Sequence, residues 1–469
     1  MILLKKFFIN FIIVSLTIVL LIFITELISN CINRDECNHK YINSNSSVEP
    51  TLFTVGYSIE VCQKCHDMIN TRKRALIDLP QLYLEGPTKD LSKTSESFMK
   101  VQYFEGDKEL NCFSTIKYQG HTSLQFEKKN YTIKFYEDQG YTTKLKLSFN
   151  GWSETSKFCL KANYIDYSNS RNVVSSNIWR SVVNSNPLID DNIRNLEFQS
   201  GIDGFPIALF LNDEYQGVYT FNIPKDEDTY EIADDENEAM FVINSSYSES
   251  AKFKALISED DRKSIYDLEY SYTDDEDIPF SSMNNLINFV INNDGLSFIN
   301  GIETYLDINA AIDYLLTTYV LGLTDNFSKN MILITYNGTK WIPIMYDLDT
   351  AFGLSFDGTK YLDYDFSIPF INDNGVIESN TDNLLWDRIL NNYITLIKER
   401  YFNLRQTILK NEEIINKFSS FINSIPNECY EYEKKLYPSI PFHNVNQIQH
   451  MSLFLQQRTK LLDEFFEKF

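Results

Sequence analysis

The chain has 469 residues and a formal net charge of −23. Hydrophobic residues make up 43% of it, which provides for a sizeable core and excludes a chain that is disordered throughout. The negative charge argues against nucleic acid as a partner, because phosphates would be repelled, and favours metal ions or a basic protein substrate.

The first predicted element is an apolar helix at the amino terminus. Residues 7–25 contain no charge and are long enough to cross a bilayer. Lys5 and Lys6 precede them, which predicts a cytosolic amino terminus and a body in the secretory lumen or outside the cell. Because no small-residue cleavage pattern follows, we expect residues 1–30 to be a retained transmembrane signal-anchor, with cleavage as the alternative. Five N-x-S/T sequons, acceptors for glycosylation, fit this route.

Residues 31–92 are predicted to form a polar stem next to the membrane. The stem holds four of the chain's seven cysteines: Cys31, Cys37, Cys62 and Cys65. Disulfides are the use we expect for cysteines in an extracellular stem. Cys62, Cys65 and His66 also match a haem-attachment pattern, although no axial methionine or second haem motif supports it. A third alternative is a zinc site that includes Cys37 and His39.

Residues 93–469 are predicted to form one α+β domain, rich in strands up to about residue 255 and rich in helices from about residue 256. Strands are expected at residues 98–104, 112–118, 131–136, 206–211 and 216–221. Helices are expected at residues 168–183, 282–292, 307–322, 384–407, 412–422 and 445–469.

The most informative stretch is residues 324–353. It reads T-D-N-F-S-K-N, an apolar run, Asn-Gly, a second apolar run and Y-D-L-D-T-A-F-G. Asn337 and Gly338 between two apolar runs predict a β-hairpin with a type I′ turn, which needs positive φ at both central residues. A two-residue turn at that point would place Asn330 opposite Met345.

This hairpin would gather acidic and amide side chains at its open end. Asp325 and Asn330 have the D-x-x-x-x-N spacing of a kinase catalytic loop, and Asp347 would lie within a few ångströms of both. Asp325 suits the orientation of an attacking hydroxyl, whereas Asp347 and Asn330 suit a metal ion that neutralises phosphate. Asp349 is either a second metal ligand or a cap. Turn and capping chemistry is the alternative for each residue taken alone. With this site at the boundary of the two halves, the layout is that of a two-lobed, protein-kinase-like fold.

Four sequence blocks carry a family resemblance. They are Y-Q-G-H-T-S to K-K-N-Y-T-I-K-F (residues 118–135), L-K-A-N-Y-I-D-Y-S-N-S-R-N (residues 160–172), G-V-Y (residues 217–219) and the hairpin segment (residues 325–353). In this order they resemble the CotH spore-coat kinase family, whose members have an atypical protein-kinase-like fold. The resemblance spans about residues 95–460.

The resemblance implies an atypical kinase that uses ATP with Mg²⁺ or Mn²⁺. It makes Asp325 the catalytic aspartate, Asn330 its partner amide and Asp347 the magnesium ligand. The leading hypothesis is a membrane-anchored kinase that phosphorylates Ser or Thr of secreted or surface proteins, basic ones in view of the chain's charge.

The same resemblance bears on cationic side chains. Lys129 is the candidate for the lysine that binds the nucleotide phosphates, with Lys128 and Lys134 as rivals. Arg171 belongs to the matched R-N pair and is expected either to meet phosphate or to brace the interface between the lobes.

Three positions depart from the family pattern. Gln119 replaces an arginine, Tyr346 a tryptophan, and Ile223 a glutamate found in many members. These departures leave open an inactive CotH-like protein that binds at a cell surface or spore coat. A kinase that acts on a small molecule or glycan is a third possibility.

Overall fold

The structure is a computed structural model that describes residues 37–198, 201–232, 237–271 and 273–469. It divides into two compact units: Met1–Asp78 with Asp213–Tyr215, and Leu79–Asn212 with Gln216–Phe469. The predicted signal-anchor lies outside the described residues. Of the helices in the described ranges, none is both long and apolar enough to span a membrane.

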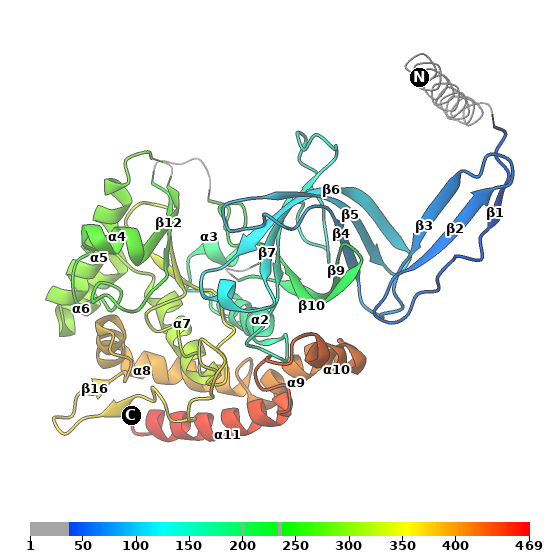
Figure 1. Ribbon diagram of the computed structural model, residues 1–469. Coiled ribbons are helices and arrows are strands. Elements are labelled where there is room, and N and C mark those ends of the chain that lie inside the picture. Colours follow the sequence, from blue (N-terminus) through cyan, green and yellow to red (C-terminus); the bar gives the residue numbers. More distant parts are fainter. Residues whose placement is uncertain (1–36, 199–200, 233–236, 272) are drawn as a thin grey trace, which may run out of the picture. The chain divides into compact units, whose positions relative to one another are not determined.

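The first unit contains a three-stranded antiparallel sheet in a region predicted to be a polar stem, for which no strand was predicted. Its strands, blue in Figure 1, are β1 (Tyr41–Asn43), β2 (Gly56–Cys62) and β3 (Met68–Lys73). The alternation of apolar and polar residues that marks a strand is weak here, because four of the six residues of β3 are exposed. The expected disulfides are not formed by the described stem cysteines, since Cys37, Cys62 and Cys65 are all free.

The second unit begins with a seven-stranded closed barrel of order β10-β8-β7-β6-β5-β4-β9. Its strands are β4 (Gln81–Glu85), β5 (Ser97–Glu105), β6 (Lys108–Gln119), β7 (Asn130–Tyr136), β8 (Lys157–Lys161), β9 (Gly204–Leu211) and β10 (Glu214–Asn222). The five strands predicted here are confirmed. β4 falls inside the predicted stem and pairs with β5 and β9, so the barrel begins before residue 93. The α+β class is confirmed; because the barrel is closed, the kinase-like lobe pattern stays a prediction.

A separate four-stranded sheet, of order β12-β11-β13-β14, carries the candidate site. Its strands are β11 (Ala239–Ile243), β12 (Tyr266–Ser271), β13 (Met331–Thr335) and β14 (Ile342–Met345). β11, predicted to belong to the strand-rich half, pairs instead with β13 in this sheet. All residues of β11, β13 and β14 are buried, which explains why almost all of them are apolar.

Helices cover this sheet and fill the rest of the unit. They are α2 (Arg171–Asn184), α3 (Asp191–Arg194), α4 (Glu259–Ser264), α5 (Asp277–Asn292), α6 (Gly295–Gly301), α7 (Ile308–Leu321), α8 (Leu384–Gln406), α9 (Asn411–Asn423), α10 (Asn427–Leu436) and α11 (Gln447–Phe466). The six predicted helices are confirmed within a few residues. Short elements complete the chain: the 3-10 helices η1 (Thr122–Gln125) and η2 (Ile302–Thr304), and the two-stranded β15 (Phe370–Ile371) and β16 (Ile377–Glu378).

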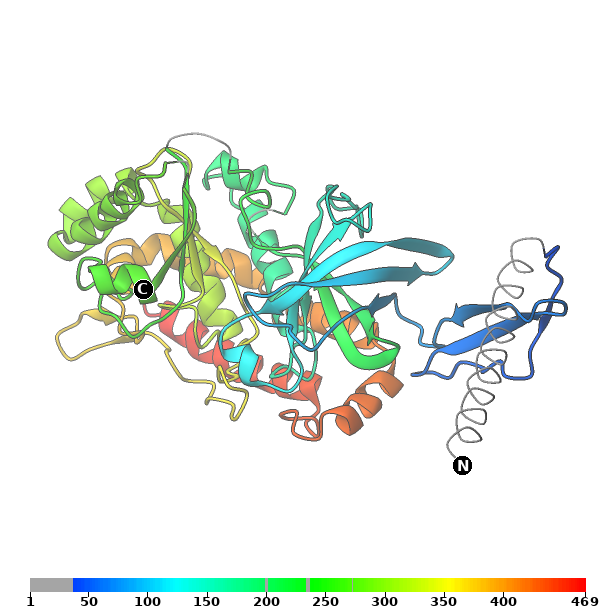
Figure 2. The same cartoon turned by 45° about the horizontal axis from the view of Figure 1, so that its top comes forward.

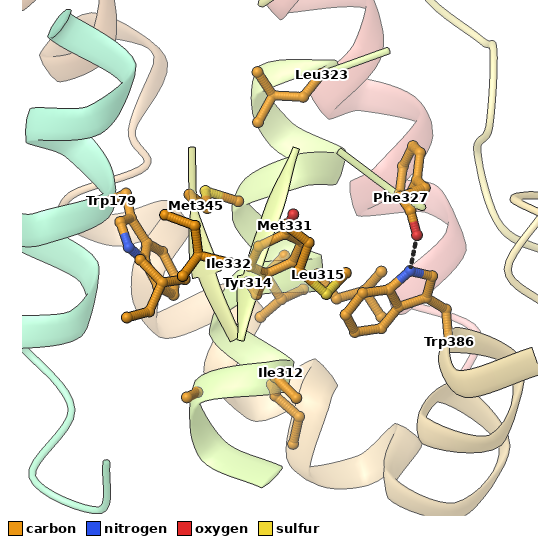
Figure 3. Close-up of a cluster of buried hydrophobic side chains, with 14 of the residues drawn as sticks. Trp179, Ile312, Tyr314, Leu315, Leu323, Phe327, Met331, Ile332, Met345 and Trp386 are labelled. Atoms are coloured by element: carbon orange, nitrogen blue, oxygen red, sulfur yellow. Dashed lines mark hydrogen bonds between the residues drawn. The ribbon is translucent and has the colours of Figure 1, made fainter. Parts of the chain in front are cut away.

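Helix α7 is the centre of the helical part. Asp307 caps it by accepting a hydrogen bond from the Ala310 N–H (2.9 Å), and Gly322 ends it at φ 60°. α7 contacts α2, α8, α11 and β14, and Figure 2 shows α8 in orange and α11 in red beside it. Its buried side chains form one core with Trp179 of α2 and Trp386 of α8, as Figure 3 shows. The sheet and α7 therefore give the loops that follow them a rigid base.

Candidate active site

The predicted β13–β14 hairpin is present, but its turn differs from the prediction. Gly338 has a positive φ of 73°, whereas Asn337 is not in the left-handed region, so the turn is not type I′. The Oδ1 atom of Asn337 instead accepts hydrogen bonds from the N–H groups of Thr339 (3.0 Å) and Lys340 (2.9 Å). This side-chain turn makes the loop wider than a two-residue turn.

The wider loop shifts the strand register by one residue. Met331 pairs with Met345, so Asn330 lies opposite Tyr346 and not opposite Met345 as predicted. Asn330 still reaches the next segment, because its Nδ2 lies 3.4 Å from the Asp347 carbonyl oxygen. Asn330 (φ 55°) and Asp347 (φ 54°) are both left-handed, a conformation that Asn and Asp adopt more readily than other side chains do.

The loop that carries Asp325 is fixed by hydrogen bonds from the core beneath it. The Tyr314 hydroxyl donates to the Asn326 carbonyl (2.8 Å). The indole of Trp386 donates to the Phe327 carbonyl (2.7 Å), drawn as a dashed line in Figure 3, and the amide of Asn383 donates to the same carbonyl (2.9 Å). Asp325 therefore projects from a loop whose backbone is held by buried side chains.

The Y-D-L-D-T-A-F-G segment is held by the R-N pair at the start of α2. Arg171 is fully buried, forms an ion pair with Asp166, and donates through Nε to the Ala351 carbonyl (2.9 Å). The Oδ1 of Asn172 accepts the Leu348 N–H (3.1 Å). Of the two roles expected for Arg171, this geometry favours the structural brace. Asp166 and Asn172 are contributors that the sequence alone did not single out.

The three lysines considered for the phosphate role are committed to other partners. Lys129 donates to the Leu124 carbonyl (2.7 Å) and to a second carbonyl of the same loop. Lys134 pairs with a glutamate at 3.0 Å. Lys128 forms a buried ion pair with a glutamate of α10. The structure therefore does not assign any of the three to phosphate.

A different lysine, Lys161 at the end of β8, lies near Tyr346, the residue before Asp347. Its Nζ lies 5.9 Å from the centre of the Tyr346 ring. Burial alone would lower the pKa of Lys161, but Tyr346, Asp347 and Asp349 raise it overall. Two features of the sequence could have identified Lys161: it follows the apolar run F-C-L, and it is the second residue of the block at residues 160–172.

Burial and neighbouring charges both act on Asp349. The pKa of Asp349 is well above its ordinary value, first because of burial and then because of the charges of Asp347 and Asp325. In the described part of the chain, neither Asp347 nor Asp349 has a hydrogen-bond or ion-pair partner for its carboxylate. Asp325 does have one, since Lys329 places its Nζ 2.6 Å from Oδ2. Lys329 is a second cation that the sequence reasoning missed.

The carboxylates of Asp325, Asp347 and Asp349 lie farther apart than the ligand atoms of a metal site that is formed by protein side chains alone. Among the described residues, the one group of three or more Cys, His, Asp or Glu ligand atoms all within 4.8 Å of one another lies in the first unit.

The comparison with protein families gives one match. Residues 116–462 match the family model described as CotH kinase protein. The chain belongs to the CotH kinase family. No curated protein matches it. In this CotH-family chain, the matched region contains Asp325, Asn330, Asp347, Asp349 and Lys161.

The departures from the CotH pattern have identifiable surroundings. Gln119 donates from Nε2 to the Cys159 sulfur (3.2 Å). Two lysines lie near the ring of Tyr346, with Lys225 Nζ 5.2 Å and Lys161 Nζ 5.9 Å from its centre. Ile223 is buried in the core of the barrel, so no carboxylate is available there to pair with a lysine.

A pocket of about 580 Å³ opens beside the catalytic-aspartate candidate of this CotH-family chain. Asp325 lies on its wall with Lys252, Lys254, Asp382 and Asp387. Asp382 forms ion pairs with both lysines. The other carboxylates on the pocket wall are therefore not paired with these lysines. Asp325 is therefore reachable from the surface through a pocket with more acidic than basic side chains on its wall.

Asp349→Asn is expected to stabilise the metal-free CotH-family protein at neutral pH. The pKa of Asp349 is raised in the native state. At pH values between its ordinary pKa and this raised pKa, the native state therefore binds more protons than the unfolded state. Stability in the wild type therefore falls as pH rises through that interval, starting from about pH 4. The variant should show a flatter profile of urea midpoint against pH in the presence of a chelator. Asp373→Asn, at an exposed position, is the control and should keep the wild-type dependence of the urea midpoint on pH. The same dependence in Asp349→Asn would contradict a raised pKa for Asp349.

Proposed function

We propose that this CotH-family protein is an Mg²⁺-ATP-dependent kinase that phosphorylates Ser or Thr residues of secreted or surface proteins. The observation that supports this most is a pair of carboxylates, Asp347 and Asp349, that have no hydrogen-bond or ion-pair partner among the described residues. They interact electrostatically with Lys161, and the amide of Asn330 lies against the Asp347 carbonyl. Asp325 lies on the neighbouring loop, which the core holds in place.

The donor set fits a hard cation. Carboxylate and amide oxygens from Asp347, Asp349 and Asn330 are the ligand type that Mg²⁺ takes in proteins, and Mn²⁺ accepts the same set. A bound Mg²⁺ supplies neutralisation of the charge on the phosphates of ATP. Lys161 would contact a phosphate oxygen from the barrel side. Asp325 would orient the attacking hydroxyl and accept its proton, while Lys329 fixes the Asp325 carboxylate.

The substrate class and the location are also parts of the proposal. The acid-rich pocket beside Asp325 and the net charge of −23 support a basic Ser- or Thr-containing protein as substrate. The uncharged residues 7–25 after two lysines support a single membrane anchor, with the body in the secretory lumen or outside the cell.

Transfer of labelled phosphate tests the proposal directly. The purified full chain, in detergent, is incubated with γ-labelled ATP, Mg²⁺ or Mn²⁺, and a set of basic and acidic peptides that contain Ser, Thr or neither. We expect metal-dependent labelling of basic Ser or Thr peptides. Labelling that survives Asp347→Asn unchanged would show that another group, or a contaminant, performs the transfer.

Lys161→Met is expected to weaken ATP binding, with a rise in KM for ATP and a fall in kcat of about 10²-fold. The reason is that the substitution removes the positive charge that would contact the phosphates. Lys129→Met is the matched control. Its ammonium is used by loop carbonyls, so it should change stability without changing KM for ATP. The reverse pattern, with KM changed only in Lys129→Met, would restore the original lysine candidate.

A second candidate function is a surface or spore-coat binding protein without catalysis. It is favoured by one observation, the buried Ile223 where many CotH members have a glutamate. Thermal unfolding with and without ATP and Mg²⁺ separates the two, because a ligand of the native state must raise the midpoint. A clear rise supports the kinase, and an unchanged midpoint at saturating nucleotide supports the binding protein.

A further inference from the structure

Four metal-ligating side chains meet in the first unit, in the segment predicted to be a stem. The sulfur atoms of Cys37, Cys62 and Cys65 and a ring nitrogen of His39 all lie within 4.8 Å of one another. The Cys37 and Cys62 sulfurs are 3.7 Å apart, and the Cys65 sulfur is 3.3 Å from His39 Nδ1. The group therefore has three thiols and one imidazole around a common centre.

The distances fit metal ligation and not a disulfide. A disulfide requires sulfur atoms about 2.05 Å apart, far less than the distance between Cys37 and Cys62. Two thiolates bound tetrahedrally to Zn²⁺ at about 2.3 Å each are separated by about 3.8 Å. The observed 3.7 Å agrees with the second arrangement.

The backbone around Cys62 and Cys65 is shaped to present both sulfurs on one side. Cys62 ends β2, and the chain then turns tightly, since the His66 N–H donates to the Cys62 carbonyl (3.0 Å) and His66 has a φ of 59°. The N–H groups of Lys64 and Cys65 point to the Cys62 sulfur. Such N–H donors stabilise a thiolate and fix the orientation of a metal ligand.

The other two ligands lie just before the adjacent strand. Cys37 and His39 precede β1, whose first residue, Tyr41, pairs with Cys62. The His39 ring stacks on Tyr41 with ring centres 5.4 Å apart, which holds the imidazole toward the sulfurs. Strand pairing therefore brings together ligands that are more than twenty positions apart in the sequence.

The first unit also needs a cross-link for stability. Its sheet has three short strands, and β3 exposes four of its six residues. A sheet of this size buries too little apolar surface to be stable by itself, and small domains commonly rely on a bound metal.

We propose that Cys37, His39, Cys62 and Cys65 bind one Zn²⁺ as a structural Cys₃His site. All four ligands come from the protein, which is typical of structural zinc and leaves no position for a reacting water. Binding releases the thiol protons to solvent and leaves the thiolates on the metal. A haem attached at Cys62 and Cys65 is disfavoured, because His66 is not part of the four-ligand group.

The metal content of the full chain tests this proposal. The wild-type protein is expressed with Zn²⁺, purified under reducing conditions, desalted and assayed for zinc by mass spectrometry; one zinc per chain is expected. Cys65→Ser and His39→Ala should lose it. Cys112→Ser and His66→Asn remove the same residue types outside the group and should retain one zinc. Wild-type protein that carries no zinc, or ligand variants that keep it, would overturn the proposal.

Two further measurements identify the ligands and the role. Protein refolded with Co²⁺ in place of Zn²⁺ should show thiolate-to-cobalt charge-transfer absorption that Cys65→Ser weakens. Chelation should expose residues 37–78 to protease while the CotH region stays intact. Resistance to protease after full zinc removal would overturn the structural role, and a disulfide mapped among these cysteines in the purified protein would overturn the site.

Discussion

Asp347→Asn is expected to lower phosphoryl transfer on the order of 10³-fold, the scale of losing one key electrostatic contact to the transition state. The metal-free protein should be at least as stable as the wild type. The carboxylate of Asp347 has no hydrogen-bond or ion-pair partner among the described residues, and its charge raises the pKa of Asp349, so removal of that charge relieves repulsion between the two. Asparagine tolerates the left-handed backbone at this position, whereas alanine would add strain.

Initial rates with labelled ATP and a basic peptide measure the first part, and urea midpoints in chelator measure the second. Asp373→Asn removes a carboxylate at an exposed position and should leave both quantities unchanged. Near-normal transfer in Asp347→Asn would make the metal-ligand assignment wrong and leave Asp349 as the candidate. A urea midpoint well below that of the wild type would show that Asp347 has a structural role.

Local patterns in the sequence predicted much of this fold. The helix α7 begins at Asp307 and ends at Gly322 as expected, because capping chemistry depends on neighbouring residues only. The β13–β14 hairpin was predictable for the same reason. Its register was not, because the side chain of Asn337 bonds two N–H groups and widens the turn by one residue.

The missed features depend on contacts between distant segments. β11 enters the sheet between β12 and β13, a pairing across about ninety residues that no local pattern reports. Lys161 of β8 lies near Tyr346 and interacts electrostatically with Asp347, although these residues are far apart in the sequence. In the first unit, strands with many exposed residues have the sequence of a polar stem, and cysteine spacing alone does not separate disulfides from a zinc site.

The ion pair between Lys128 and Glu433 is another such contact, and it ties the barrel to α10. The two side chains are 0% and 1% exposed and come from positions 305 residues apart. Lys128 also donates to the Val218 carbonyl and lies 4.7 Å from the centre of the Tyr219 ring. Gly217 makes room for the pair, since a Cβ there would be 3.0 Å from Glu433 Oε1. The K-K and G-V-Y blocks of the family therefore meet at this pair.

Lys128→Met is expected to destabilise the protein by about 3–5 kcal/mol, because it leaves Glu433 buried without a counter-charge. Burial lowers the pKa of Lys128 and raises that of Glu433, so each charge needs the other. Glu433→Gln should show a similar loss. The double variant Lys128→Met, Glu433→Leu should recover part of it, since two apolar side chains of similar size leave no buried charge.

Urea denaturation of the four proteins measures these free energies of unfolding. Lys134→Met is the matched control, because Lys134 lies on the same barrel and its pair with Glu96 is about one-third exposed on each side, at 32% and 30%. An exposed pair contributes about 0–1 kcal/mol, so this variant should be nearly neutral. If Lys128→Met cost no more than Lys134→Met, the buried pair would not stabilise the fold. A double variant no more stable than either single variant would show that packing at this position, and not the unpaired charge, causes the loss.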